Sequence, residues 1–127
     1  MSLDITPLVP SGRQVIEAYG DGGFVIAGAR YTGSVIVFPE RTFVWRAAAV
    51  ADVTEAALAP LFEAPAPAEI LVIGCGPRFL PAPVALRAAI RARGPALEWM
   101  DTGAACRTFN VLLAEGRPVA AALIAVA

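Results

Sequence analysis

The 127-residue sequence contains no histidine and no lysine. Histidine is the commonest general base and metal ligand near neutral pH, and it is the usual partner of a nucleophilic serine or cysteine. Its absence excludes histidine-dependent catalytic triads and most zinc sites. The ten basic residues are all arginines, and eleven acidic residues bring the formal net charge to −1. The chain therefore lacks the basic surface that nucleic-acid-binding domains carry, and we expect no nucleic acid partner.

Cysteines and long apolar runs are also scarce. Cys75 and Cys106 are too few for a four-thiolate metal site and do not form a C-x-x-C motif, so we expect two reduced, buried thiols and no metal. The longest apolar run, residues 119–127, is far shorter than the about 20 residues that a membrane-spanning helix needs. The start of the chain resembles neither a signal peptide nor an arginine-rich transit peptide. These features predict a cytoplasmic protein without an integral membrane segment.

Small apolar residues are abundant instead. Hydrophobic residues make up 57% of the chain, above the usual 45–50% or so. The length fits one domain that needs no metal or disulfide to hold its core. We therefore expect a single domain over residues 1–127, with residues 1–12 as an irregular N-terminal arm. Apolar side chains in excess of the core would form a partner surface. The partner could be another copy of the chain, which would make a homo-oligomer.

The first half of the chain has the pattern of antiparallel strands. Residues 14–19 and 24–27 flank an Asp-Gly-Gly turn, which is a hairpin signal. Residues 34–38 and 42–46 are β-branched and aromatic, with a Pro-Glu break between them. The pattern predicts an antiparallel meander of four strands.

The second half alternates helices and strands. A helix is predicted over residues 53–63, and the run at 69–73, apolar on both faces, is typical of an interior parallel strand. The next helix would begin at Pro83, end at Gly94 and bury Val84, Leu86, Ala89 and Ile90. A strand at 97–100, a helix from 101–102 to 115 and a final strand in the tail follow. The fold class is α/β, a meander followed by helix–strand repeats around a mixed central sheet.

The segment from Ile70 to Pro77 carries the sharpest local motif, a strand that enters a Gly-x-Gly turn. It is similar to the first motif of S-adenosylmethionine-dependent methyltransferases and to half of a dinucleotide fingerprint. Phe79 replaces the third glycine, however, and Pro81 and Pro83 set the next helix back from the turn. Only about fifty residues follow, too few for a doubly wound cofactor sheet. The motif is therefore interpreted as a tight turn, and no cofactor is expected.

A second segment, Asp101–Asn110, places small residues at a helix start, where free N–H groups favour anions. If the two parallel strands are adjacent, this start and the Gly74–Arg78 turn meet at one sheet edge. Arg78 and Arg107 could then hold a carboxylate or phosphate, although solvated arginines paired with Glu98 or Glu115 are the simpler reading. The candidate ligand or partner surface comprises Gly74, Cys75, Gly76, Arg78, Asp101, Thr102 and Arg107. No catalytic residues are predicted, because Cys75 has no base beside it.

Aromatic residues offer a second kind of contact surface. Tyr31, Trp45 and Trp99 could be exposed anchors for a protein partner, and residues of these types are more often part of the core.

Three segments resemble one known family: Tyr31–Val37, Leu71–Gly76 and Met100–Ile124. It is the conserved domain family that includes the mitochondrial NADH dehydrogenase (complex I) assembly factor three and many uncharacterised bacterial and archaeal proteins. The last stretch is the most specific, because Cys106-Arg107, Asn110 and Glu115-Gly116-Arg117 occur in the family's order. We expect no targeting segment, and on that expectation the chain resembles a bacterial member.

The resemblance implies a three-layer fold and a non-catalytic role in assembling a respiratory complex. The implied partner is a respiratory-complex subunit or another assembly factor, which could hold the protein at the inner membrane. The alternative function is a domain that binds a small anion or a nucleotide-like ligand, or that senses redox state, at the edge formed by Gly74–Arg78 and Asp101–Arg107.

Overall fold

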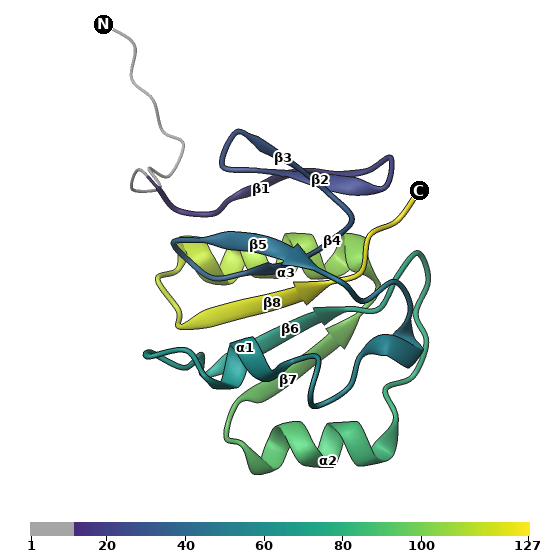
Figure 1. The fold of residues 1–127 in the computed structure, drawn as a ribbon. Coiled ribbons are helices and arrows are strands. Elements are labelled where there is room, and N and C mark those ends of the chain that lie inside the picture. The colour runs from purple at the N-terminus through teal and green to yellow at the C-terminus, as the bar shows by residue number, and fades with distance from the viewer. Residues whose placement is uncertain (1–11) are drawn as a thin grey trace, which may run out of the picture.

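The computed structural model describes residues 12–127 (Figure 1). Strands β1 (Ile16–Gly20), β2 (Gly23–Ile26) and β3 (Ala29–Thr32) form a small antiparallel sheet. Its two turns are tight because Asp21 and Gly22, and then Ala27 and Gly28, take positive φ angles of 49–80°. Such turns match the twist of the strands that they connect. The predicted hairpin is confirmed, and β3 is an additional strand.

A second, five-stranded sheet forms the centre of the molecule, with the order β5-β4-β8-β6-β7. Its strands are β4 (Ser34–Val37), β5 (Thr42–Trp45), β6 (Ile70–Gly74), β7 (Ala96–Met100) and β8 (Val119–Leu123). β8 runs antiparallel to β4 and parallel to β6, so the sheet is mixed as predicted. The single four-stranded meander is wrong, because the chain leaves the first sheet at Gly33 and β4–β5 join the second.

The helices are η1 (Val50–Asp52), α1 (Ala59–Phe62), α2 (Val84–Ala92) and α3 (Thr102–Ala114). The helix predicted over residues 53–63 is wrong in its first half. Pro60 lies in the first turn of α1, where a proline is tolerated, and it could not have lain in a helix interior. Asp52 instead accepts hydrogen bonds from the amides of Ala48 and Ala49, at 2.8 and 3.1 Å. It therefore closes the 3₁₀ turn that precedes α1.

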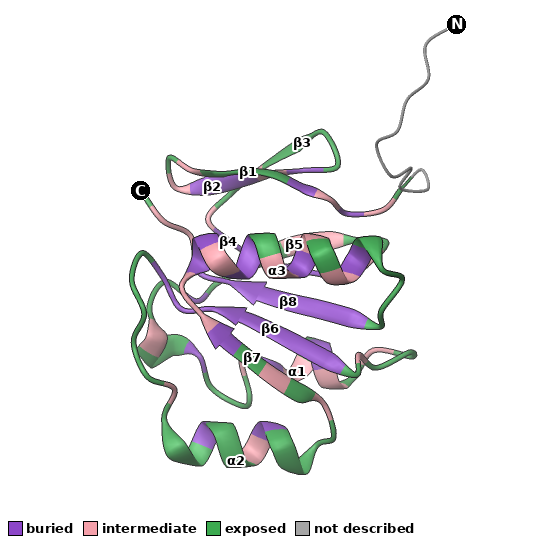
Figure 2. Cartoon of the chain, turned by 180° about the vertical axis from the view of Figure 1, so that it is seen from behind, coloured by how far each residue is buried: buried purple, intermediate pink, exposed green. Residues whose placement is uncertain are grey.

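The five-stranded sheet is the middle of three layers (Figures 1 and 2). On one face, α3 and the small sheet bury a core that includes Phe24, Val37 and Phe109. On the other face, α1 and α2 bury a second core that includes Ile73 and Ile90. Trp45 and Trp99 are 7% and 8% exposed and belong to this second core, and Tyr31 is half-buried beside the first. The predicted three-layer α/β fold is confirmed.

The side-chain amide of Asn110 ties α3 to β1. Its Oδ1 accepts from the amide of Ile16 at 2.9 Å, and its Nδ2 donates to the carbonyl of Ile16 at 2.8 Å. Asn110 thus acts as a strand partner for Ile16, which is followed by a register shift in the β1–β2 pair. In the described part of the chain, no helix is long and apolar enough to cross a membrane. The arm predicted at the N-terminus lies outside the described residues, except for Gly12.

Candidate functional site

The two predicted turns meet at the carboxyl ends of β6 and β7, which are adjacent parallel strands. At the end of β6, Gly74 lies directly against the start of α3. A Cβ atom on Gly74 would stand 2.9 Å from both the Cα and the Oγ1 of Thr102. Real Cβ atoms do not approach other atoms so closely. The position requires glycine because of this contact, since its φ angle is ordinary.

Thr102 is fully buried and connects three segments. Its amide donates to the carbonyl of Gly76 at 2.9 Å, and its hydroxyl accepts from the amide of Gly76 at 3.1 Å. The same hydroxyl donates to the carbonyl of Ile124, just after β8, at 2.7 Å. The hydroxyl therefore satisfies one donor and one acceptor of the buried backbone, as a buried polar group must.

The start of α3 is capped by the protein itself. The Oδ1 of Asp101 accepts from the amide of Ala104 at 3.0 Å, as an N-cap residue does. The Tyr19 side chain of β1 lies over the same turn, so that a Cβ on Gly103 would be 2.5 Å from its hydroxyl oxygen. The amides of Thr102 and Ala104 at this helix start are thus engaged within the protein, and the Tyr19 side chain occupies the space over Gly103, which leaves less room for an anion.

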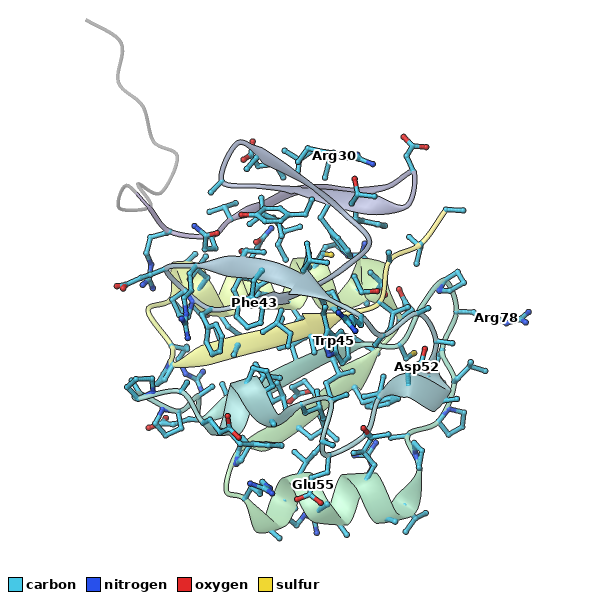
Figure 3. The ribbon with its side chains drawn as sticks, viewed as in Figure 1. Arg30, Phe43, Trp45, Asp52, Glu55 and Arg78 are labelled. Carbon is cyan, nitrogen blue, oxygen red and sulfur yellow. The ribbon has the colours of Figure 1, made fainter. Side chains whose placement is uncertain are left out.

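The remaining candidates lie around this centre. Cys75 is 3% exposed, and its Sγ is 3.5 Å from both the Arg78 carbonyl and the Leu80 amide. The Arg78 side chain points away from the molecule (Figure 3). Arg107 is exposed on α3. Among residues 12–127 the ion pair is Arg93–Glu55, so neither Arg78 nor Arg107 is paired with Glu98 or Glu115.

Cys106 packs in the core between α3 and the sheet and is 3% exposed. Burial raises the pKa of its thiol from 9.0 to about 12, against the opposing effect of the neighbouring Arg107 charge. The thiol is therefore protonated, and thiolate chemistry is disfavoured at this position.

This pKa predicts a pH dependence of stability. Between pH 9.0 and about 12 the unfolded chain releases the Cys106 proton while the folded chain keeps it. Stability is therefore full below pH 9.0 and falls as the pH rises through this window. Urea unfolding below and inside the window should show a steeper decline for the wild type and for Cys75→Ala than for Cys106→Ala. Equal declines in all three would contradict the assignment.

Two cavities of the described chain lie away from this edge. One of about 620 Å³ lies between α1 and the end of α2 and includes Phe62 and Arg93 in its wall. A second, of about 480 Å³, is lined by Phe38, Arg41 and the prolines at 39, 65 and 118. Within residues 12–127, no group of three or more cysteine, aspartate or glutamate residues could hold a metal ion.

The sequence predicted correctly that four residues lie close together: Gly74, Gly76, Asp101 and Thr102. It gave no role to Asn110 or Tyr19, although both fix the position of α3. Asn110 is 94 residues away from its partner Ile16 in the chain, and Tyr19 is 84 residues away from Gly103, over which it lies. The only signal for Asn110 was its place in the Met100–Ile124 segment.

Comparison with known proteins identifies relatives over most of the chain. A family described as "Protein of unknown function (DUF498/DUF598)" matches residues 16–124. The bovine protein named NADH dehydrogenase [ubiquinone] 1 alpha subcomplex assembly factor 3 is 37% identical over 109 residues, 86% of this chain and 59% of the bovine protein. An uncharacterised protein of Rhodobacter capsulatus is 35% identical over 90% of this chain and 86% of its own length. The chain thus spans about three-fifths of the mammalian relatives that it matches.

Solved structures show the same fold. A crystal structure described as an outer membrane protein from Bartonella henselae has a TM-score of 0.83 and 39% identity, covering 92% of this chain and 98% of that one. The solution structure of a Bordetella pertussis protein, described as a Mth938-like domain, has a TM-score of 0.81 and 30% identity over 98% of this chain and 92% of its own. The family match, the sequence relatives and these structures agree, and this chain belongs to the DUF498/DUF598 family, whose relatives include the NADH dehydrogenase assembly factor 3 proteins.

Proposed function

We propose that this protein is a non-catalytic binding module that assists the assembly of a respiratory NADH dehydrogenase. The observation that carries the proposal is the 37% identity to a protein named as an assembly factor of that enzyme, over 86% of this chain. The family match covers residues 16–124, so it includes both core clusters of the fold.

The geometry of the candidate site supports binding rather than turnover. Thr102 and Asp101 are engaged in hydrogen bonds that hold β6, β8 and α3 together. Cys75 faces inward. What the site presents to solvent is Arg107 on α3 and Arg78 with the loop that follows it. A surface of this kind contacts another macromolecule more readily than it encloses a small substrate.

A deletion strain of the organism that encodes the protein tests this function. We expect less assembled NADH dehydrogenase on native gels and lower NADH:quinone activity in membranes, both restored by the wild-type gene. Succinate dehydrogenase in the same membranes is the matched control and should be unchanged. A full complement of assembled NADH dehydrogenase in the deletion strain would refute the proposed function.

A further inference from the structure

The loop between β6 and α2 is held from the inside. The Nε1 of Trp99 donates to the carbonyl of Leu80 at 2.7 Å. The buried sulfur of Cys75 contacts the Leu80 amide and the Arg78 carbonyl, at 3.5 Å each. Prolines at positions 77, 81 and 83 each fix one φ angle of the same loop. The backbone of this loop is therefore ordered without any partner.

The outer side of the same loop is apolar. Phe79 and Leu80 are 58% and 43% exposed, and Val84, in the first turn of α2, is 85% exposed. The sequence predicted Val84 to be buried, and this is wrong. The buried residues of α2 are Leu86 and Ile90, and Ala89 is half-buried. Large apolar side chains that are exposed within one short, ordered stretch of chain favour an interaction surface.

The charged residues along this stretch of the sequence are all arginines. From residue 70 to residue 97 the chain contains four arginines and no carboxylate. Arg93 is paired with Glu55, whose side chain lies close to α2 in Figure 3. Arg87 follows Val84 by three residues and Arg91 follows Arg87 by four, so both exposed arginines continue the exposed stripe of Val84 along α2. Neither they nor Arg78 form an ion pair within residues 12–127.

We propose that this arginine–apolar surface is the docking site for a protein partner whose contact face has an apolar centre flanked by carboxylates. The surface comprises Arg78, Phe79, Leu80, Val84, Arg87 and Arg91. The proposal rests on the proposed binding function and names the chemistry of its partner. Apolar side chains would fill the centre of the interface, and guanidinium groups would form paired hydrogen bonds with carboxylates at its rim.

Two other occupants fit less well. A second copy placed on this surface by two-fold symmetry would bring unpaired arginines against arginines, and like charges oppose such contact. A lipid bilayer accepts apolar side chains in many orientations and gains little from a backbone that is fixed in advance. Binding to a shaped protein pocket is stronger when the backbone is fixed in advance, because less conformational entropy is lost on binding.

The test places a photoreactive benzophenone residue at position 84 of the full chain in the native organism. Position 111 is the matched control, because Val111 is also exposed, at 57%, and lies on α3. We expect irradiation to join position 84, but not position 111, to one identified protein. Adducts with lipid, adducts with a second copy of the chain, or no adduct at position 84 would overturn the proposal.

Charge reversal separates a specific interface from accidental proximity. The pair Arg78→Glu and Arg87→Glu should lower the adduct yield at position 84 by at least about tenfold, because each change replaces an attraction by a repulsion. Both positions are exposed, so the circular dichroism spectrum and the unfolding midpoint should be unchanged. Replacing carboxylates of the identified partner by arginine should restore the adduct. A yield that does not respond to charge reversal would overturn the proposal.

The two proposals can fail separately. If the charge-reversed chain fully restores NADH dehydrogenase in the deletion strain, the surface is wrong and the assembly function stands. If position 84 reacts with an acidic partner while the deletion strain assembles NADH dehydrogenase normally, the surface stands and the assembly function is wrong.

Discussion

Replacing Gly74 by valine is expected to lower the free energy of unfolding by about 3 kcal/mol, a large part of the total of about 5–15 kcal/mol for a domain. The first added carbon alone would meet the Thr102 Cα at 2.9 Å and the Leu123 side chain at 3.1 Å. The Cα of Thr102 cannot withdraw without moving α3. The clash therefore disrupts the hydrogen bonds that Thr102 makes to Gly76 and Ile124.

Chemical denaturation of Gly74→Val, Gly74→Ala and Gly28→Ala measures this effect. Gly28 is the matched control, because a Cβ there meets nothing within 4 Å and only its positive φ of 80° opposes substitution. That strain costs about 1–2 kcal/mol. Gly74→Val should be the least stable of the three. If Gly74→Val were no less stable than Gly28→Ala, the close contact between β6 and α3 would be refuted.

Replacing Asn110 by alanine is expected to cost about 2–4 kcal/mol, because it leaves both the amide and the carbonyl of Ile16 without their partner. Ile16 is 5% exposed, so water replaces these bonds poorly. The loss should appear as a lower midpoint of thermal unfolding. It should also increase hydrogen exchange across β1 and β2, because Asn110 joins these strands to α3.

Two variants on the same helix control for this result. In Asn110→Asp one carboxylate oxygen still accepts from the Ile16 amide, and the other faces the Ile16 carbonyl and repels it, so aspartate should rescue stability only in part. Val111→Ala removes an exposed side chain one position away and should change stability by less than about 0.5 kcal/mol. If Val111→Ala lost as much stability as Asn110→Ala, the loss would reflect helix propensity and not the hydrogen bonds between Asn110 and Ile16.

The elements with strong local signals were predictable from the sequence. The run at 69–73 is apolar on both faces, and β6 lies between two strands and is buried along its whole length. Asp101 and Gly116 bracket α3 as cap and stop residues. These signals succeed because burial on both faces and the chemistry of helix ends are local properties.

Other elements depended on contacts that the sequence does not display. β3 is short, exposed and bounded by glycines, so it resembles a loop until it pairs with β2. Val84 has an apolar side chain at the start of a helix and was expected inside, yet the orientation of α2 is set by Leu86 and Ile90. Pro60 was a visible signal against the long helix at 53–63 and was overlooked.

The candidate site was predictable only in part, for the same reason. The adjacency of the Gly74 and Asp101 turns follows from parallel strand order, and the structure shows it. The hydrogen bond from the Thr102 hydroxyl to Ile124 joins segments whose meeting depends on the whole sheet. That these residues form a surface for a ligand or a partner stays a prediction.

The position of β8 in the five-stranded sheet determines how late in synthesis this protein can complete its fold. β8 follows every other strand in chain order, yet it lies in the middle of the five-stranded sheet, between β4 and β6. Until residues 119–123 have left the ribosome, the β4–β5 hairpin and the β6–β7 pair remain separate half-sheets, each with an open edge. Unpaired edges invite association with other chains. The nascent protein therefore depends on β8 to close these edges, and a pause in translation before Val119 would prolong their exposure.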